Sequence, residues 1–222
     1  MHLGVIPDGN RRYADNHDIS NEEAYRQAKG VIKDIGDDLR DNDEITEVTF
    51  YLLSEENLQR DDQELETLLK LLEEYIEDVS SSYSDNGFVL NWASTNPEAL
   101  PEHMREKIRG LEEKFDSGDR RLNMLISYSG RNDILRASKK ISEDDEEFSR
   151  ENMLDRLEVG SQMDFVIRTG DNPTRECLSD FSIWNSSYAE FYHIKKNFPA
   201  VETSDVKNAL DHYSSLRRKR GQ

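Results

Sequence analysis

The loop at residues 8–13 brings together a carboxylate, a glycine and two guanidinium groups directly after a strand-like run. Its sequence is Asp8-Gly9-Asn10-Arg11-Arg12-Tyr13. Asp8 offers the oxygen ligand that Mg²⁺ prefers, Gly9 permits a tight turn close to an anion, and Arg12 can clamp a phosphate. The same residues also suit an ordinary Asp-Gly-Asn turn that caps a helix. On its own, this loop leaves both interpretations open.

Two further segments place polar and cationic side chains after strand-like runs. One is Ser54-Glu55-Glu56-Asn57-Leu58-Gln59-Arg60, and the other is Arg168-Thr169-Gly170-Asp171, followed by Arg175 and Ser179. Ser54 or Asn57 could simply cap a helix, and Arg60 could simply lie on the surface. Guanidinium groups gathered at neighbouring strand ends nevertheless suit a diphosphate, because its paired oxygens accept bidentate hydrogen bonds. In a strongly acidic chain, such a cluster is informative.

Alternating strand-like and helix-like segments predict how these loops are positioned. Strands are expected at residues 2–7, 47–53, 88–93, 122–127, 164–167 and 190–194, and helices at residues 21–40, 61–80, 97–115, 131–141 and 203–218. Strands separated by helices predict an α/β fold, with one domain over residues 1–222, a mostly parallel six-stranded sheet and flanking helices. In such sheets, ligands bind beyond the carboxyl ends of the strands, where the polar loops lie.

The composition of the chain indicates which partners and which cellular location to expect. It has 47 acidic and 29 basic residues, a formal net charge of −18, and acidic residues spread along its whole length. Such a surface repels nucleic-acid phosphates, and we expect no nucleic-acid partner. A cytoplasm at high salt favours this composition because the salt screens the self-repulsion, although an ordinary acidic protein is the alternative. The single cysteine, the lack of a long apolar run and the lack of a secretory leader predict a cytoplasmic protein.

Four segments together resemble the cis-prenyltransferase family, which includes the undecaprenyl diphosphate synthases. Residues 2–14 resemble its opening motif, and residues 48–60 resemble its second strand with the Ser-x-Glu-Asn-x-x-Arg loop. Residues 122–134 are similar to its Tyr-Gly-Gly-Arg region, and residues 164–192 are similar to its long C-terminal motif. The segments occur in the family order and cover almost the whole chain. The resemblance implies an enzyme that condenses isopentenyl diphosphate with an allylic prenyl diphosphate, using Mg²⁺.

The resemblance also implies roles for individual residues. Asp8 would act in catalysis with Asn10 and would organise Mg²⁺, with Glu190 as a second acidic residue of the metal site. The substrate-binding residues would be Gly9, Arg11, Arg12, Tyr13, Ser54, Asn57, Arg60, Arg168, Arg175 and Ser179. Among these, Gly9 and Arg12 would hold the allylic diphosphate, together with Asn10. The diphosphate of isopentenyl diphosphate would be gripped by Arg60, Arg168 and Ser179.

Further features follow from the same resemblance. An apolar tunnel between the sheet and helices such as residues 61–80 would house the growing chain, although ordinary core packing explains the same leucine stripe. The family usually forms homodimers, and its polyprenyl diphosphate product serves as a lipid carrier for glycans. The resemblance leaves open whether the protein touches a membrane peripherally when the product is released. Neither the length of the product nor the allylic starter is predicted.

Three features depart from the family pattern. Tyr25 stands where most members have a histidine, and Cys177 replaces an arginine. The chain ends Arg218-Lys219-Arg220-Gly221-Gln222, which is close to the Arg-x-Gly ending of many members but shifted. These positions concern substrate contacts, where one lost charged hydrogen bond costs about 1.5–3 kcal/mol. They keep open a silent homologue that acts as a partner subunit. An α/β hydrolase with Asp8 as nucleophile is less favoured because no histidine-based triad accompanies it.

Overall fold

The computed structural model describes residues 1–40, 42–84, 87–172 and 177–219. Its strands form one sheet in the order β3-β4-β2-β1-β5-β6, and every neighbouring pair is parallel. The strands are β1 (His2–Ile6), β2 (Glu47–Ser54), β3 (Phe88–Ala93), β4 (Arg120–Tyr128), β5 (Phe165–Thr169) and β6 (Glu190–Ile194). The predicted α/β fold is confirmed, and the predicted strand ends differ from these by at most about two residues.

Helices lie between the strands and after the last one. They are α1 (Asn10–His17), α2 (Asn21–Arg40), α3 (Asp62–Ser84), α4 (Glu102–Lys114), α5 (Gly130–Glu143), α6 (Arg150–Arg156) and α7 (Thr203–Lys219). Short 3₁₀ turns are found at Glu56–Gln59, Pro97–Ala99 and Phe198–Ala200. The sequence did not predict α1 and α6, because eight and seven residues are too few to show a helical period. The helix predicted at residues 97–115 is interrupted at Leu100, whose backbone is extended because Pro101 follows it.

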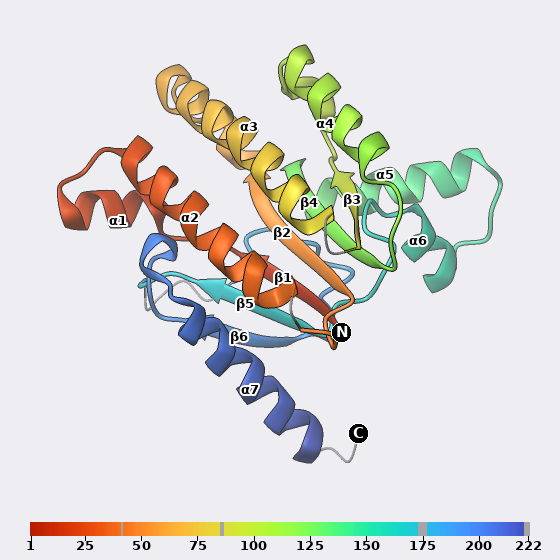
Figure 1. The fold of residues 1–222 in the computed structure, drawn as a ribbon. Coiled ribbons are helices and arrows are strands. Elements are labelled where there is room, and N and C mark those ends of the chain that lie inside the picture. The colour runs from red at the N-terminus through yellow and green to blue at the C-terminus, as the bar shows by residue number, and fades with distance from the viewer. Residues whose placement is uncertain (41, 85–86, 173–176, 220–222) are drawn as a thin grey trace.

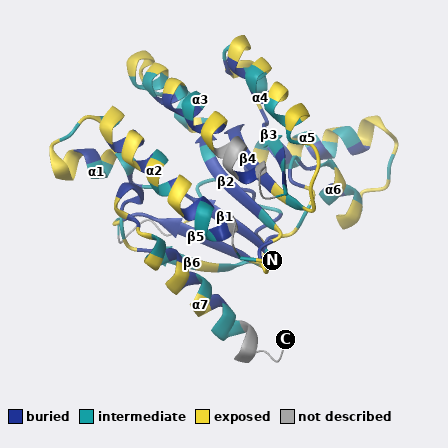
Figure 2. Cartoon of the chain, viewed as in Figure 1, coloured by how far each residue is buried: buried dark blue, intermediate teal, exposed yellow. Residues whose placement is uncertain are grey.

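Helices cover both faces of the sheet, and the four central strands are mostly buried, whereas the edge strands β3 and β6 are partly accessible (Figures 1 and 2). α2, α3, α4 and α7 pack on one face and enclose the larger apolar core. On the other face, a smaller core forms between the strands and the loops around Val159 and Phe181, and α5 packs against α6 beside it. Among the described helices, none is both long enough and apolar enough to cross a membrane.

The strand order places a topological switch point between β1 and β5. The chain leaves β1 toward β2 on one side, whereas it leaves β5 toward β6 on the opposite side. Because the two connections diverge, the loops that follow these strands leave a crevice at their carboxyl ends. The loop at residues 7–9 and the segment after Thr169 therefore meet where open α/β sheets bind ligands.

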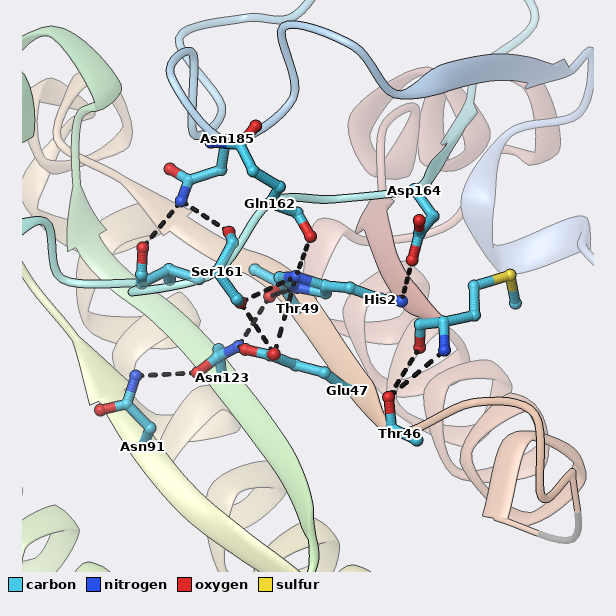
Figure 3. A network of polar contacts seen from close by, with 12 residues as sticks. His2, Thr46, Glu47, Thr49, Asn91, Asn123, Ser161, Gln162, Asp164 and Asn185 are labelled. Carbon is cyan, nitrogen blue, oxygen red and sulfur yellow. Dashed lines mark hydrogen bonds and ion pairs between the residues drawn. The ribbon is translucent and has the colours of Figure 1, made fainter. Parts of the chain in front are cut away.

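The amino ends of the strands carry a buried network of polar side chains (Figure 3). Nε2 of His2 lies 2.7 Å from Thr49 Oγ1. The Asn123 amide donates to Thr49 Oγ1 at 2.9 Å and to Glu47 Oε1 at 2.7 Å, and Asn91 donates to Asn123 Oδ1 at 2.8 Å. Burial lowers the pKa of His2 below its usual 6.5, and the nearby Glu47 carboxylate offsets only part of this effect. Each of these side chains has its partner inside the network.

Candidate active site

The loop between β1 and α1 is fixed by contacts with two other strand ends. Gly9 precedes α1 with a φ of 103°, and a Cβ atom there would lie 2.2 Å from Asn197 Oδ1. Glycine is required because the backbone is left-handed and the neighbouring side chain is so close. The Asp8 backbone N–H donates to Thr169 Oγ1 at 2.9 Å, and the Asp8 carbonyl accepts from the Phe198 N–H at 3.0 Å. The loop is thus connected to the ends of β5 and β6.

The Asp8 carboxylate lies between two guanidinium groups. Arg168 Nη2 donates to its Oδ2 at 2.5 Å, and Arg12 Nη2 lies 3.3 Å from its Oδ1. Burial alone would raise the pKa of Asp8, but the charges of Arg12 and Arg168 lower it below its usual 3.8. Asp8 is therefore ionised at neutral pH. Its side chain is 25% exposed, so a ligand in the cleft can reach it.

Arg168, the last but one residue of β5, is held on two sides. Besides its bond to Asp8, its Nη1 donates to Ser179 Oγ at 2.9 Å and to the backbone carbonyl of Cys177. Only 5% of Arg168 is exposed, so its guanidinium group has little freedom to move. Cys177 contributes its backbone carbonyl to this arrangement.

Arg60, at the end of the second polar loop, is held by three side chains. Its Nη2 donates to Asn57 Oδ1 at 2.7 Å, and its Nη1 donates to Glu64 Oε1 at 2.9 Å and to the Tyr25 hydroxyl. Burial raises the pKa of Tyr25 above its usual 10.0, so the hydroxyl keeps its proton and donates to Glu64 Oε1 at 3.3 Å. Tyr25 therefore helps to position Arg60.

These groups line one cleft of about 440 Å³ at the carboxyl end of the sheet. The predicted site residues that it brings together are Asp8, Gly9, Asn10, Arg11, Arg12, Ser54, Asn57, Arg60, Arg168 and Ser179. They come from the segments that follow β1, β2 and β5, which are far apart in the sequence and adjacent in the sheet. Guanidinium groups gathered in this way, in a chain with a net charge of −18, indicate a site for phosphate groups.

Glu190 is not brought to Asp8. It begins β6 and pairs with Phe165, whereas His193, further along β6, pairs with Arg168. At about 3.3 Å per residue, Glu190 lies about 10 Å along the strand from the level of Arg168, toward the amino end of the sheet. The predicted sharing of one metal ion by Asp8 and Glu190 is therefore not found within one chain.

Two further predicted residues lie elsewhere. The Tyr13 ring stacks on the His17 ring, with centroids 4.0 Å apart, and Tyr13 is not among the residues that line the cleft. Arg175 lies outside the described residues. Tyr13 therefore does not add to the geometry of the cleft.

Sequence reasoning missed two residues that complete the surroundings of Arg12. Asp171 Oδ1 accepts from Arg12 Nε at 3.1 Å, so that Arg12 lies between the carboxylates of Asp8 and Asp171. Asn197 Nδ2 donates to Asp171 Oδ2 at 2.8 Å. Both residues follow the carboxyl ends of strands, so the rule that placed the other loops could have found them.

An apolar cavity of about 80 Å³ adjoins the cleft between α2, α3 and β2. Asn10 and Tyr25 border the cavity, and Ala28, Ile32 and Leu72 line it further along. It is smaller than the cavity of about 150 Å³ that accommodates benzene in another protein. The described residues do not show the predicted tunnel, and this narrow apolar space lies where it was expected.

The fold and the cleft define an α/β protein with a cluster of guanidinium groups, suited to phosphate, at the switch point of a parallel sheet. The model of the family described as "Putative undecaprenyl diphosphate synthase" matches residues 6–221. The chain belongs to this family, the cis-prenyltransferases, and is a prenyl diphosphate synthase. The family resemblance noted in the sequence is thereby confirmed.

Individual relatives agree with this assignment. An isoprenyl transferase of Campylobacter jejuni (strain RM1221) is 29% identical over 98% of this chain and 96% of its own length. A tritrans,polycis-undecaprenyl-diphosphate synthase (geranylgeranyl-diphosphate specific) of Thermoplasma acidophilum is 32% identical over 99% of this chain and 87% of its own length. The crystal structure of a probable undecaprenyl diphosphate synthase from Campylobacter jejuni has a TM-score of 0.81 and 26% identity, and the match covers 100% of this chain and 98% of that one.

Proposed function

We propose that this enzyme condenses isopentenyl diphosphate with an allylic prenyl diphosphate, in the presence of Mg²⁺, to make a cis-polyprenyl diphosphate. The carrying observation is the ionised Asp8 carboxylate between Arg12 and Arg168, in the same cleft as Arg60. The reaction breaks the C–O bond of the allylic diphosphate, forms a C–C bond to isopentenyl diphosphate and releases a proton. Separate guanidinium groups suit the diphosphates of two substrates better than a single small anion.

The residues of the cleft support a division of labour between the two diphosphates. Asn10 and Arg12 lie in the first turn of α1, directly after Gly9, and would hold the allylic diphosphate. Arg168 and Ser179, already hydrogen-bonded to each other, would grip isopentenyl diphosphate with Arg60. In the free enzyme, Arg12 and Arg168 bind the carboxylate of Asp8, and we propose that they exchange it for phosphate oxygens when substrate enters.

The donor set around Asp8 fits Mg²⁺ bound together with a substrate. The described residues contain no group of three or more His, Cys, Asp or Glu side chains that could hold a metal ion alone. Mg²⁺ is commonly bound by one or two carboxylates together with substrate phosphates and water, and Asp8 is an ionised, reachable carboxylate. When bound, the ion would neutralise negative charge on the departing diphosphate. Glu190 lies too far along β6 to share such a site with Asp8 of the same chain.

An allylic cation also has to be kept away from water. The narrow apolar cavity beside Asn10 and Tyr25 supports entry of the hydrocarbon chain between α2 and α3, as in the predicted tunnel. Most of the cavity is lined by apolar side chains such as Ile32, Leu68, Leu71 and Leu72, which do not react with a cation, although Lys29 and three tyrosines also border it. The hydrocarbon part of the substrate would thus be separated from the charged cleft.

Further expectations are carried as part of this proposal. The product would serve as a lipid carrier for glycans, the enzyme would form a homodimer, and product release would involve a peripheral contact with a membrane. The dispersed acidic residues support work in a cytoplasm at high salt. The alternative of a silent partner subunit has less support, because Asp8, Arg12, Arg60 and Arg168 are all retained and meet in one cleft.

A turnover assay with product sizing tests the proposal. The purified protein is incubated at high salt with Mg²⁺, labelled isopentenyl diphosphate and geranylgeranyl diphosphate, the starter named for the Thermoplasma acidophilum relative. We expect extension to longer prenyl diphosphates and none in an Asp8→Ala control. Wild-type protein that extends the starter no further than this control would contradict the proposed function and favour the partner subunit.

A further inference from the structure

A strained loop closes around the guanidinium group of Arg168. The Cys177 carbonyl and Ser179 Oγ both accept from Arg168 Nη1. Ser179 and the next residue, Asp180, have left-handed backbones with φ angles of 49° and 66°. Residues with a Cβ atom avoid this region, and two in succession are unfavourable. The loop therefore needs other contacts that hold it in this shape.

Asp180 makes these contacts at the amino end of α5. Its Oδ2 accepts from the Ser129 hydroxyl at 2.5 Å, and its Oδ1 accepts from the Arg131 backbone N–H and from Arg131 Nε, each at 3.1 Å. The first N–H groups of a helix lack partners within the helix, and the helix dipole favours a negative charge there. The carboxylate of Asp180 thus occupies the position where a helix end would bind an anion.

The backbone of Asp180 lies equally close to α5. Its carbonyl accepts from the Gly130 N–H at 2.8 Å. A Cβ atom on Gly130 would lie 2.7 Å from this carbonyl oxygen, so that any other residue would push the loop away. Both the side chain and the main chain of Asp180 therefore attach the loop to the first turn of α5.

We propose that Asp180 is a positioning residue for isopentenyl diphosphate, which it affects through Ser179 and Arg168. The inference rests on the proposed function, in which Ser179 and Arg168 grip that diphosphate. Asp180 is not among the residues that line the cleft, whereas Ser179 and Arg168 are. Asp180 acts by fixing the hydroxyl of its neighbour in the direction of the guanidinium group.

This support matters most when substrate is bound. In the free enzyme, Asp8 holds Arg168 from one side and the loop at residues 177–180 holds it from the other. Once the Asp8 carboxylate turns to another ligand, Ser179 and the Cys177 carbonyl are the contacts that still orient Arg168. Asp180 then determines whether Arg168 presents its donors to the diphosphate in a fixed direction.

The first test compares Asp180→Ala with the conservative Asp180→Asn. For Asp180→Ala, we expect KM for isopentenyl diphosphate to rise about tenfold, with kcat and the KM for the allylic substrate changed by less than about twofold. Asp180→Asn should be intermediate because its amide oxygen still accepts from the Arg131 N–H. An unchanged KM for isopentenyl diphosphate in a folded Asp180→Ala variant would overturn the proposal.

A matched control separates positioning from the loss of a helix cap. Ser149 caps α6, where its Oγ accepts from the Asn152 N–H at 3.0 Å, away from the cleft. Ser149→Ala should lower the midpoint of thermal unfolding and leave every KM unchanged. If Asp180→Ala lowers the midpoint and likewise leaves every KM unchanged, Asp180 is only a helix cap and the proposal fails.

Two further variants test the route through Ser179. In a Ser179→Ala background, Asp180→Ala should raise KM by less than it does in the wild type, because the hydroxyl that Asp180 positions is already absent and only the Cys177 carbonyl still contacts Arg168. A further additive rise would show that Asp180 acts by another route and would overturn the proposal. Gly130→Ala should raise the same KM by displacing the Asp180 carbonyl, although alanine is the better helix former. If Asp180→Ala does not fold, Asp180→Asn and Gly130→Ala decide.

Binding of inorganic pyrophosphate, measured by calorimetry, distinguishes this inference from the proposed function. If the wild-type protein extends no prenyl chain, the proposed function fails, but pyrophosphate can still occupy the cleft. Weaker pyrophosphate binding by Asp180→Ala than by the wild type and by Ser149→Ala would then support the positioning role. Equal binding by all three proteins would overturn it.

Discussion

The two ends of the sheet are both polar, but they are built differently. At the amino ends, His2, Thr49 and Asn123 are buried and bind one another and their neighbours (Figure 3). At the carboxyl ends, Asp8 and Arg12 are charged, partly exposed and border an open cleft. At the amino ends the polar side chains bind one another, whereas at the carboxyl ends the charged side chains form ion pairs that face the cleft.

The difference shows what makes polar side chains available to a ligand. A partly exposed ion pair contributes about 0–1 kcal/mol, so a diphosphate can replace the Asp8 carboxylate on Arg12 at little cost. Breaking a buried hydrogen bond leaves an unsatisfied group and costs about 1–3 kcal/mol. The amino-end network is therefore expected to serve stability, and the carboxyl-end cluster to serve binding and catalysis.

Replacing the central carboxylate of the cleft should have the largest effect. Asp8→Asn removes the charge between Arg12 and Arg168, and we expect kcat/KM to fall at least about 100-fold. The matched control is Asp34→Asn, which makes the same change in charge at an exposed position of α2 and should leave kcat/KM unchanged. Comparable activity of wild type and Asp8→Asn, in steady-state assays, would contradict the role assigned to the cleft.

The backbone beside Asp8 should be nearly as sensitive. Gly9→Ala forces a Cβ atom into a left-handed backbone and against Asn197, so we expect a loss of about 1–3 kcal/mol in the free energy of unfolding and about tenfold lower kcat/KM. Gly110→Ala, at an exposed position in α4 with open space around it, should instead stabilise the protein by about 0.5–1 kcal/mol. Urea unfolding and steady-state kinetics measure both variants. Similar behaviour of the two alanines would argue against a strained turn at Gly9.

A substitution in the amino-end network should affect stability alone. Thr49→Val leaves the buried Nε2 of His2 without its partner and removes one of the two acceptors of the Asn123 amide, and we expect about 1–3 kcal/mol lower free energy of unfolding with unchanged kcat/KM. Thr67→Val, on the surface of α3, is the matched control and should change stability by less than about 0.5 kcal/mol. A fall in kcat/KM for a stable Thr49→Val protein would mean that the two ends of the sheet are coupled.

The smallest expected effect is the pH dependence of stability. The pKa of His2 is lower in the folded protein than its usual 6.5, so its contribution to stability is present above that pH and is lost as the pH falls through the lowered value. Burial raises the pKa of Asp133 to about 6, which acts in the opposite direction, since that contribution is lost as the pH rises through about 6. Asp133→Asn removes the opposing effect. Urea unfolding between pH 5 and pH 7 should then show a steeper rise of stability with pH than in the wild type.

The fold and most of the cleft could be predicted because they depend on local patterns. The strands are short apolar runs separated by helices, and ligands in such sheets gather at the carboxyl ends. Asp8, Arg60 and Arg168 each follow or end a strand, so their meeting follows from topology. The short helices α1 and α6 were missed because the helical period needs a longer segment.

Side-chain partners could not be predicted in the same way. Nothing in the sequence around Tyr25 indicates that its hydroxyl would meet Arg60, since the two come from different crossovers. Glu190 is the first residue of the strand predicted at residues 190–194, so a parallel sheet already places it at the opposite end from Asp8, and the register of β6 against β5 confirms this. Asp180 was passed over because its role depends on a left-handed backbone, for which aspartate is only weakly diagnostic.

Helix α2 borders both the charged cleft and the apolar cavity. Asn21 and Tyr25 line the cleft, and Ala28 and Ile32 line the cavity of about 80 Å³. If the proposed hydrocarbon chain enters between α2 and α3 and is larger than this space, the two helices would have to separate, and the hydrogen bond between Tyr25 and Arg60 would be displaced with α2. The length of the hydrocarbon chain in the apolar cavity would then affect the position of Arg60 in the charged cleft. The affinity for isopentenyl diphosphate would therefore change with each isoprene unit added. If the affinity for isopentenyl diphosphate is the same with short and with long prenyl diphosphates bound, the chain in the cavity does not affect Arg60.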